Sequence, residues 1–175
     1  EMDILARNGT AVVHNPQSNL NNAVGIADII KMQEKGILVG LGTDAMTVKM
    51  PEELRVALWA QHIRNSNPTC GFMEVANTLL NNNRKIASRY WNLALGTIEE
   101  DAAADIILID YFPPTPLDET TYLGHIIFGL SQSAVDTTIA NGKVLMENKI
   151  LKIDVNEEEA SAKSKELTIK LWERF

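Results

Sequence analysis

The sequence predicts an α/β fold, and three observations support this prediction. Short apolar runs at Gly9–His14 and Ile37–Leu41 have the composition of buried strands. Between them, Ala23–Lys35 carries apolar residues at helical spacing, and Gly36 follows as a residue suited to end a helix. A strand, a helix and a second strand in this order form a β-α-β unit whose strands run parallel. We therefore expect residues 9–44 to form such a unit.

Helices are expected after this unit, and strands after the helices. Pro51 suits the first turn of a helix over Glu52–Asn65, and two further helical stretches are predicted over residues 72–80 and 86–93. From Gly96 onward the pattern favours β-structure. Strands are predicted at residues 106–109 and at residues 134–151, the latter as two strands joined by an Asn-Gly dipeptide typical of tight hairpins.

Residues 156–175 predict an amphipathic helix. Asn156 and Glu159 have the spacing of a capping box, and Leu167 and Leu171 lie on one apolar stripe. Because such a stripe is stabilised by packing, we expect this helix to dock on the body of the protein. The tryptophans are likewise expected as anchors of the core; they are Trp59, Trp91 and Trp172.

Composition excludes several classes of function. The 175 residues are 45% hydrophobic and 22% charged, which suits one globular domain or slightly more. A net charge of -7 and a pI near 5.0 argue against nucleic acid or anionic lipid as partners, and leave a small-molecule substrate or another protein as the expected partner. No apolar run approaches the ~20 residues that cross a bilayer. The single cysteine, Cys70, cannot form an internal disulfide, so a cytoplasmic location is expected.

The main catalytic candidate is Asp44. Asp44 follows the second predicted strand and His14 ends the first. The carboxyl ends of parallel strands share one rim, and α/β barrels keep their catalytic groups on that rim. The sequence therefore predicts that His14 and Asp44 lie at the same rim.

Several ordered segments of the chain carry a family resemblance. His-Asn-Pro-Gln-Ser-Asn-Leu at residues 14–20 is followed by Gly-Leu-Gly-Thr-Asp at residues 40–44. These two segments resemble strands seven and eight of the amidohydrolase superfamily, in its cytosine deaminase and chlorohydrolase-like branch. Residues 95–109 and 135–144 resemble the exit from its barrel and the hairpin of its small β-sandwich. Residues 111–129 are most similar to aminohydrolases of the SsnA type.

The resemblance implies a fold and an activity. It implies the C-terminal part of a metal-dependent hydrolase TIM (β/α)8 barrel over residues 1–95, comprising strands seven and eight plus helices. Part of a small β-sandwich would follow over residues 96–155, and the docking helix over residues 156–175. The implied reaction is hydrolysis of a C–N or C–halogen bond in a ring or amidine-like small molecule, through a metal-activated water.

The resemblance also implies a metal site. In the family, one divalent metal ion, zinc or iron, is held by a His-x-His pair, two further histidines and an aspartate, and Asp44 matches that aspartate. His14, Ser18 and Asn19 are the candidates for the substrate pocket. The same residues have structural alternatives: Asp44 as a cap for the following segment, His14 as a turn residue, and Ser18 and Asn19 as helix caps.

The chain departs from the family pattern in its histidines. It has no His-x-His pair, and its histidines are His14, His62 and His125. Since a catalytic site of this kind needs about three protein ligands, Asp44 alone cannot hold the metal. Together with a first residue other than Met, this predicts a C-terminal fragment that is inactive and metal-free alone, and that forms homo-oligomers through exposed edges.

Two further points remain open at the level of sequence. Ala45 stands where relatives often carry glycine, which puts the local backbone in question. An alternative class of function also remains, a non-catalytic α/β binding or interaction module whose β-α-β unit only looks like the end of a barrel. The sequence does not distinguish ammonia from halide as the leaving group, or zinc from iron as the metal.

Overall fold

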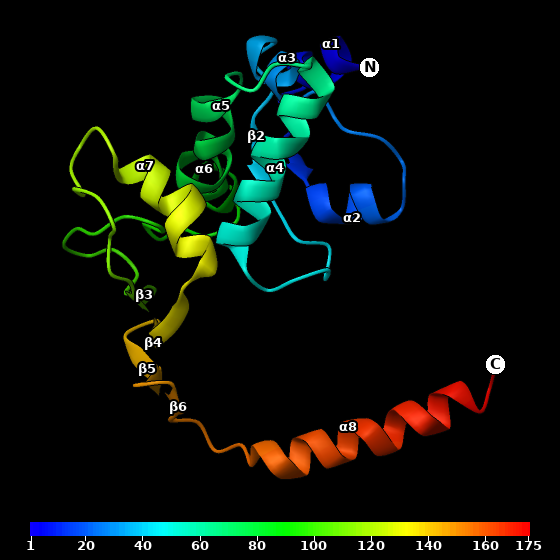
Figure 1. The fold of residues 1–175 in the computed structure, drawn as a ribbon, viewed down its shortest axis with the longest axis vertical. Coiled ribbons are helices and arrows are strands. Elements are labelled where there is room, and N and C mark those ends of the chain that lie inside the picture. The colour runs from blue at the N-terminus through cyan, green and yellow to red at the C-terminus, as the bar shows by residue number, and fades with distance from the viewer.

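The structure, a computed structural model, describes residues 1–175. It contains a parallel pair of strands with helices packed around it, a four-stranded antiparallel sheet, and a C-terminal helix that extends away from both (Figure 1). None of the helices has the length and apolar character required to span a bilayer.

The elements follow one another along the chain with these bounds: α1 (Met2–Arg7), β1 (Val12–His14), α2 (Pro16–Asn21), α3 (Ile29–Glu34), β2 (Val39–Leu41), α4 (Met50–Asn65), α5 (Phe72–Asn77), the π-helix η1 (Thr78–Asn82), α6 (Asn83–Ala87), β3 (Ile106–Asp110), α7 (Tyr122–Gly124), the π-helix η2 (His125–Gly129), the 3-10 helix η3 (Leu130–Gln132), β4 (Ala134–Ala140), β5 (Lys143–Glu147), β6 (Ile150–Leu151) and α8 (Glu157–Trp172).

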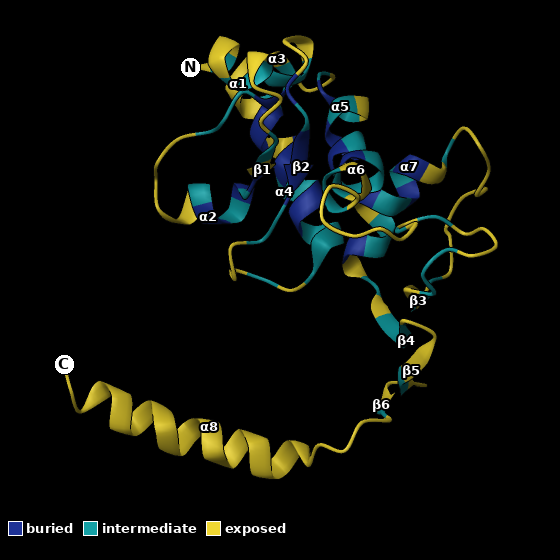
Figure 2. Cartoon of the chain, turned by 180° about the vertical axis from the view of Figure 1, so that it is seen from behind, coloured by how far each residue is buried: buried dark blue, intermediate teal, exposed yellow.

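The predicted parallel strand pair is confirmed. β1 and β2 pair in parallel, with Val12 opposite Val39 and His14 opposite Leu41. Every residue of β2 is buried, and apolar side chains from α3, α4 and α5 join it in one core (Figure 2). The fully buried members of that core include Ile29, Leu54, Leu58 and Val75. This core fixes the strand ends where the candidate site lies.

The helix predicted over Ala23–Lys35 is shorter than expected. It begins only at Ile29, because the Asp28 side chain accepts a hydrogen bond from the Lys31 amide and caps the helix there. Upstream, Gly25 has a φ of 94°, which no helix accommodates. The end of the helix is confirmed, since Gly36 follows it at a φ of 78°.

In the later part of the chain, the predicted hairpin is confirmed, and a helical segment appears where β-structure was expected. β3, β4, β5 and β6 form one antiparallel sheet in that order, and Asn141 and Gly142 turn the hairpin at φ values of 48° and 75°. The expectation of β-structure after Gly96 is wrong for residues 122–132, which are helical. Ile127 of this helical segment is fully buried in the core beside α4. Apolar residues there pack as core rather than as strand.

The C-terminal helix forms as predicted but does not pack as predicted. The Asn156 side chain accepts hydrogen bonds from the Glu158 and Glu159 amides at 3.1 and 3.2 Å and starts α8. No residue of α8 is buried, and the helix stands apart from the rest of the chain (Figures 1 and 2). The expected docking on the body therefore does not occur within these 175 residues, because no surface of the chain lies against the apolar stripe.

The tryptophan prediction is also wrong. Trp59, Trp91 and Trp172 are 48%, 60% and 67% exposed. On α4 the buried positions are taken by smaller neighbours such as Ala57 and Leu58, which turns Trp59 outward. There the Arg55 guanidinium lies 5.0 Å from the centre of the Trp59 ring, which covers one face of the indole without burying it.

Candidate functional site at the ends of β1 and β2

The candidate site forms where the two parallel strands end. The Gly42 amide donates to the His14 carbonyl at 2.9 Å, so the two strand ends are joined beyond the last paired residues. A side chain at position 42 would lie 2.5 Å from Asn15 Oδ1 and 2.7 Å from Val13 Cγ1. A residue with a Cβ at position 42 would therefore have to displace these two side chains. His14 is the last residue of β1, and Asp44 lies three residues after the end of β2.

The backbone at Asp44 and Ala45 is left-handed. Their φ values are 46° and 58°, in a turn that is exposed to solvent. Aspartate tolerates this conformation because its short polar side chain can bond locally, but alanine gains nothing from it. The backbone at Ala45 is thus strained.

Ser18 is the residue that the structure brings to Asp44. Its Oγ donates a hydrogen bond of 2.7 Å to Asp44 Oδ2, across 26 positions of sequence. Ser18 lies on α2 and is only 5% exposed, and its oxygen accepts a bond of 3.3 Å from Asn22 Nδ2. Asn19, the next residue of α2, is half-buried, and its amide donates to the Asn15 carbonyl.

His14 is a buried and neutral imidazole. The residue is 3% exposed, and its Nε2 has no hydrogen-bond partner. Burial lowers the pKa of His14 to about 4, because the protonated ring is disfavoured away from water. At neutral pH this side chain therefore offers an uncharged ring nitrogen without a partner at the rim of the site.

Glu53 is a residue that sequence reasoning missed. It lies on α4 with no exposed surface, its Oε2 accepts from the Gln17 amide at 3.3 Å, and its Oε1 has no partner. Burial raises the pKa of the Glu53 carboxyl. In the sequence it reads only as an acidic residue in the first turn of a helix, so its contact with α2 left no signal there.

The remaining histidines lie on other elements of the fold. His62 is half-buried on α4. His125 is buried in η2, where Nδ1 pairs with the Tyr111 hydroxyl at 2.6 Å and Nε2 with the Pro116 carbonyl at 3.1 Å. Both ring nitrogens of His125 are thus engaged in holding the proline-rich loop.

The side chains of this chain do not supply the full ligand set of a metal ion. No cluster of three or more His, Cys, Asp or Glu side chains suited to a metal is present in residues 1–175. A catalytic zinc needs about three protein ligands. The exposed Asp44 carboxylate, with one oxygen held by Ser18, fits the part of one ligand and no more. The site is therefore incomplete within this chain.

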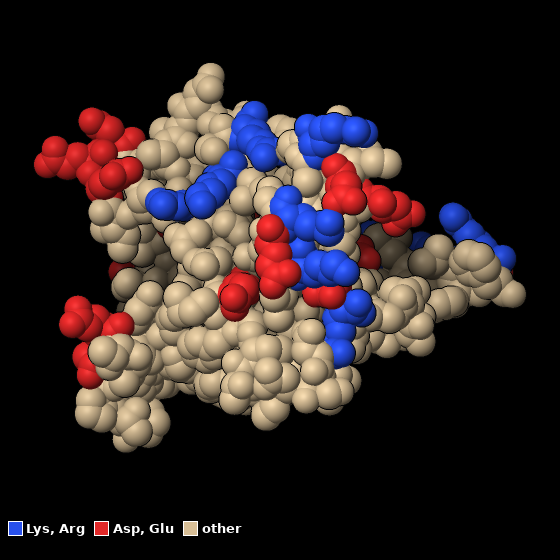
Figure 3. Space-filling view, turned by 90° about the horizontal axis from the view of Figure 1, so that it is seen from above, with Lys and Arg blue, Asp and Glu red and all other residues tan.

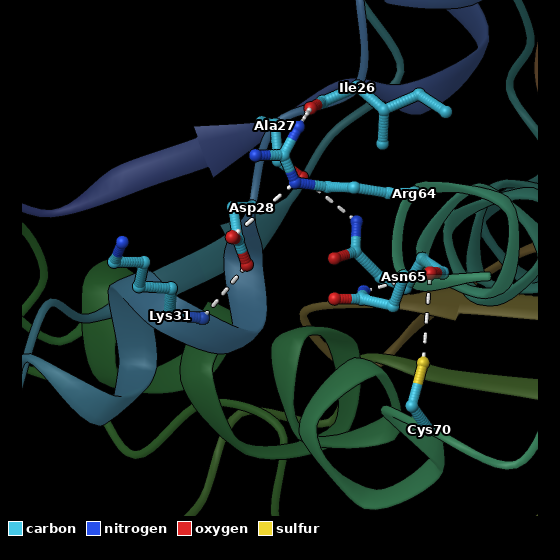
Figure 4. Close-up of polar contacts among 8 residues, drawn as sticks. Ile26, Ala27, Asp28, Lys31, Arg64, Asn65 and Cys70 are labelled. Carbon is cyan, nitrogen blue, oxygen red and sulfur yellow. Dashed lines mark hydrogen bonds and ion pairs between the residues drawn. The ribbon is translucent and has the colours of Figure 1, made fainter. Parts of the chain in front are cut away.

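A second polar cluster ties the loop before α3 to α4 and is structural (Figure 4). Arg64 lies 3.4 Å from Asp28 Oδ2, Gln61 Nε2 donates to the Ala27 carbonyl at 2.9 Å, and Cys70 Sγ lies 3.6 Å from the Gln61 carbonyl. Seen from above, basic and acidic side chains adjoin one another over the middle of the surface, and acidic groups alone stand along its left edge (Figure 3).

The comparisons with known proteins fit this arrangement. The sequence model described as the amidohydrolase family matches residues 1–145. The chain belongs to the amidohydrolase family. It is 36% identical over 156 residues to a 5-methylthioadenosine/S-adenosylhomocysteine deaminase of Dictyoglomus thermophilum, covering 87% of this chain and 36% of the relative. It is 38% identical over 162 residues to the deaminase of the same name from Carboxydothermus hydrogenoformans, covering 86% and 35%.

Solved structures of the family share this fold. An adenosine deaminase from Xanthomonas campestris with bound zinc superposes with a TM-score of 0.76 at 21% identity, covering 97% of this chain and 39% of that one. Atrazine chlorohydrolase TrzN from Arthrobacter aurescens, complexed with zinc, gives 0.73 at 25% identity, covering 95% and 38%. This amidohydrolase-family chain thus has the mixed α/β fold of deaminases and chlorohydrolases, and spans little more than a third of their length.

Proposed function

We propose that this chain is the C-terminal portion of a metal-dependent hydrolase that removes an amino or halogen substituent from a ring or amidine-like small molecule. The observation that supports this most is the position of Asp44, at the joined ends of two parallel strands with one carboxylate oxygen held by Ser18. The kinship with deaminases and chlorohydrolases supports the same reaction class.

The proposal includes the arrangement of the complete protein. β1 and β2 would be strands seven and eight of a (β/α)8 barrel over residues 1–95, and β3 to β6 would form part of a small β-sandwich over residues 96–155. The helix α8, in residues 156–175, would dock on parts of the protein that these residues do not include. Its exposed apolar stripe supports this, with Leu167 and Leu171 53% and 47% exposed.

Asp44 has two parts in the proposed reaction. Oδ2 accepts a hydrogen bond from the Ser18 hydroxyl and keeps a second lone pair, and the Asp44 carboxylate would ligate one divalent ion, zinc or iron, and exchange protons. Such an ion lowers the pKa of a bound water to about 7. Asp44 would accept the proton of the attacking water and return it to the leaving group. His14, as a neutral imidazole, and Asn19 would contact the substrate, with Ser18 beside them.

The test is product release by the full-length protein. We expect ammonia from 5-methylthioadenosine, S-adenosylhomocysteine or adenosine, or chloride from atrazine, and we expect Asp44→Ala to abolish release. Asp154→Ala, at an exposed residue before α8, serves as the matched control and should keep full activity. Turnover that survives Asp44→Ala unchanged contradicts the role of Asp44. Absence of both turnover and metal binding in the wild type favours the non-catalytic α/β module.

We further propose that the protein is a cytoplasmic homo-oligomer. Side chains of β3 such as Ile107 and Leu108 are 51% and 53% exposed, which favours association. Light scattering should show the 175-residue chain as a dimer or larger, and a monomer at high concentration contradicts this. Cell fractionation tests the location, with recovery outside the cytoplasmic fraction as the contrary result.

A further inference from the structure

We propose that the cavity beside η2 is a second small-molecule site, and that it takes an uncharged aromatic ring carrying an N–H group. The cavity has a volume of about 530 Å³, within the range of small-molecule sites in proteins. It shares no residue with the candidate site at the ends of β1 and β2, and α2 and α7 lie on opposite sides of α4 (Figure 1). Binding in this cavity requires neither Asp44 nor a metal ion.

The lining of the cavity is aromatic and carries no carboxylate, ammonium or guanidinium group. Phe72 at the start of α5 and Phe128 of η2 line it, and Phe128 is 47% exposed. Tyr111 adds a third ring, and threonine hydroxyls and the His125 ring supply the polar part. A charged ligand would lose its hydration here without gaining an ionic partner. A neutral ring would cover aromatic surface that is otherwise exposed to water.

The hydrogen bonds of His125 decide what the Tyr111 hydroxyl can offer to a ligand. The Pro116 carbonyl only accepts, so His125 Nε2 carries the hydrogen at that contact of 3.1 Å. In the neutral imidazole, Nδ1 then accepts from the Tyr111 hydroxyl, 2.6 Å away. The hydroxyl proton of Tyr111 is thus engaged, and its oxygen is left as an acceptor. The matching group on a ligand is therefore a donor such as a ring N–H.

Tyr111 is held in position before a ligand binds. Its ring meets the His125 ring edge to face, with 5.7 Å between the ring centres, and His125 itself is only 8% exposed. A Cβ at position 129 would collide with the Tyr111 hydroxyl and lie 2.6 Å from Tyr111 Cζ. The absence of a side chain at Gly129 thus leaves the space that the Tyr111 ring occupies. A ring fixed in advance loses little freedom when a ligand binds.

The test compares indole with N-methylindole as probes of the full-length protein. The two probes share one ring system, but N-methylindole has no N–H group. Dissociation constants are measured by ligand-observed NMR at a pH above the titration range of histidine. We expect indole to bind, and N-methylindole to bind about 2- to 10-fold more weakly, because it cannot donate to the Tyr111 oxygen.

Three variants locate the probe. Tyr111→Phe keeps the ring but removes the accepting oxygen, so the preference for indole over N-methylindole should disappear. Tyr122→Phe is the matched control, because Tyr122 begins α7 outside the cavity lining, and this variant should keep the preference. Phe128→Ala should weaken both probes about 2- to 10-fold through the lost ring contact. Since Phe128 is half-exposed, its truncation also decides the location should Tyr111→Phe fail to fold.

Each contrary result overturns a stated part of the proposal. Absence of indole binding up to its solubility limit overturns the site, including the case in which other parts of the full-length protein fill the cavity. Indole binding that Phe128→Ala leaves unchanged also overturns the site, because the probe then binds elsewhere. A preference for indole that survives Tyr111→Phe overturns the role of the Tyr111 oxygen. None of these results bears on the proposed function, which is tested through Asp44.

Discussion

α4 and α8 are helices of equal length with opposite surroundings. Each spans 16 residues and begins with acidic side chains in its first turn. α4 buries six residues against β2 and the neighbouring helices, whereas α8 buries none. The difference shows that length, capping and an apolar stripe make a helix, but only an opposing surface makes it part of a core.

The two helices therefore differ in what stabilises them. Burial of a leucine such as Leu54 or Leu58 on α4 contributes about 1.5–3 kcal/mol each. α8 has its Asn156 cap and the exposed ion pairs of Glu166 with Lys163 and Lys170, which lower the pKa of the Glu166 carboxyl. Exposed pairs add little, and an isolated helix of this length is marginal in water.

The largest expected effect is a direct contrast between the two helices. Leu58→Ala on α4 opens a cavity in the core and should cost about 2–5 kcal/mol of unfolding free energy. Leu171→Ala on α8, at a residue 47% exposed, should cost less than about 0.5 kcal/mol. Urea denaturation measures both. Equal losses of unfolding free energy in the two variants would show that α8 packs on a surface in solution, and would contradict the difference between the two helices.

The next effect is the pH dependence of the unfolding free energy that the buried His14 causes. Because burial holds the pKa of His14 near 4, the unfolded chain binds a proton between pH 6.5 and 4 that the folded chain does not. This stabilisation is present above pH 6.5 and is lost as pH falls through 4, by about 3 kcal/mol in total.

Denaturation of wild type and His14→Gln at several pH values measures this contribution. The difference between the two proteins cancels the opposite effect of Glu53, whose raised pKa favours the folded state at low pH. An unchanged slope in His14→Gln contradicts the assignment to His14.

A smaller effect is expected from the strained turn after β2. Ala45→Gly should stabilise the protein by about 1 kcal/mol, because glycine adopts the observed φ of 58° without the cost that alanine bears. Ala162→Gly in the exposed interior of α8, a helix that buries no residue, should change the unfolding free energy by less than about 0.5 kcal/mol. Thermal denaturation distinguishes them, and destabilisation by Ala45→Gly argues against strain at this turn.

The smallest effect is expected from removal of α8. Ending the 175-residue chain after Val155 should change its unfolding free energy by less than about 0.5 kcal/mol, since α8 buries no residue. The same truncation in the full-length protein should be more costly if the proposed docking occurs. Equal and negligible effects in both proteins contradict that docking.

What the sequence predicts well is local. The Asn141–Gly142 hairpin follows from turn chemistry, and the β1–β2 pair follows from two apolar runs flanking a helix. The apolar pattern predicts a helix that starts at Ala23, but the helix starts after Asp28. The left-handed backbone at Gly25 and the cap at Asp28 set that start. The start of α3 is an error of boundary, whereas the helical segment at residues 122–132 is an error of element type.

What the sequence does not predict depends on contacts between distant segments. Ser18 and Asp44 are 26 positions apart, and Glu53 and Gln17 are 36 apart, so neither contact leaves a pattern in the chain. The outward turn of Trp59 and the free stripe of α8 depend on which surfaces are present. Periodicity gives the face of a helix, but it does not give the partner of that face.

The measurement that tests the account most directly is the metal content of the purified full-length protein, with Asp44→Ala and Asp154→Ala beside it. If Asp44 ligates the metal, the wild type and Asp154→Ala hold about one equivalent of a divalent ion, and Asp44→Ala holds none. Metal content that is the same in all three proteins contradicts the assignment of Asp44.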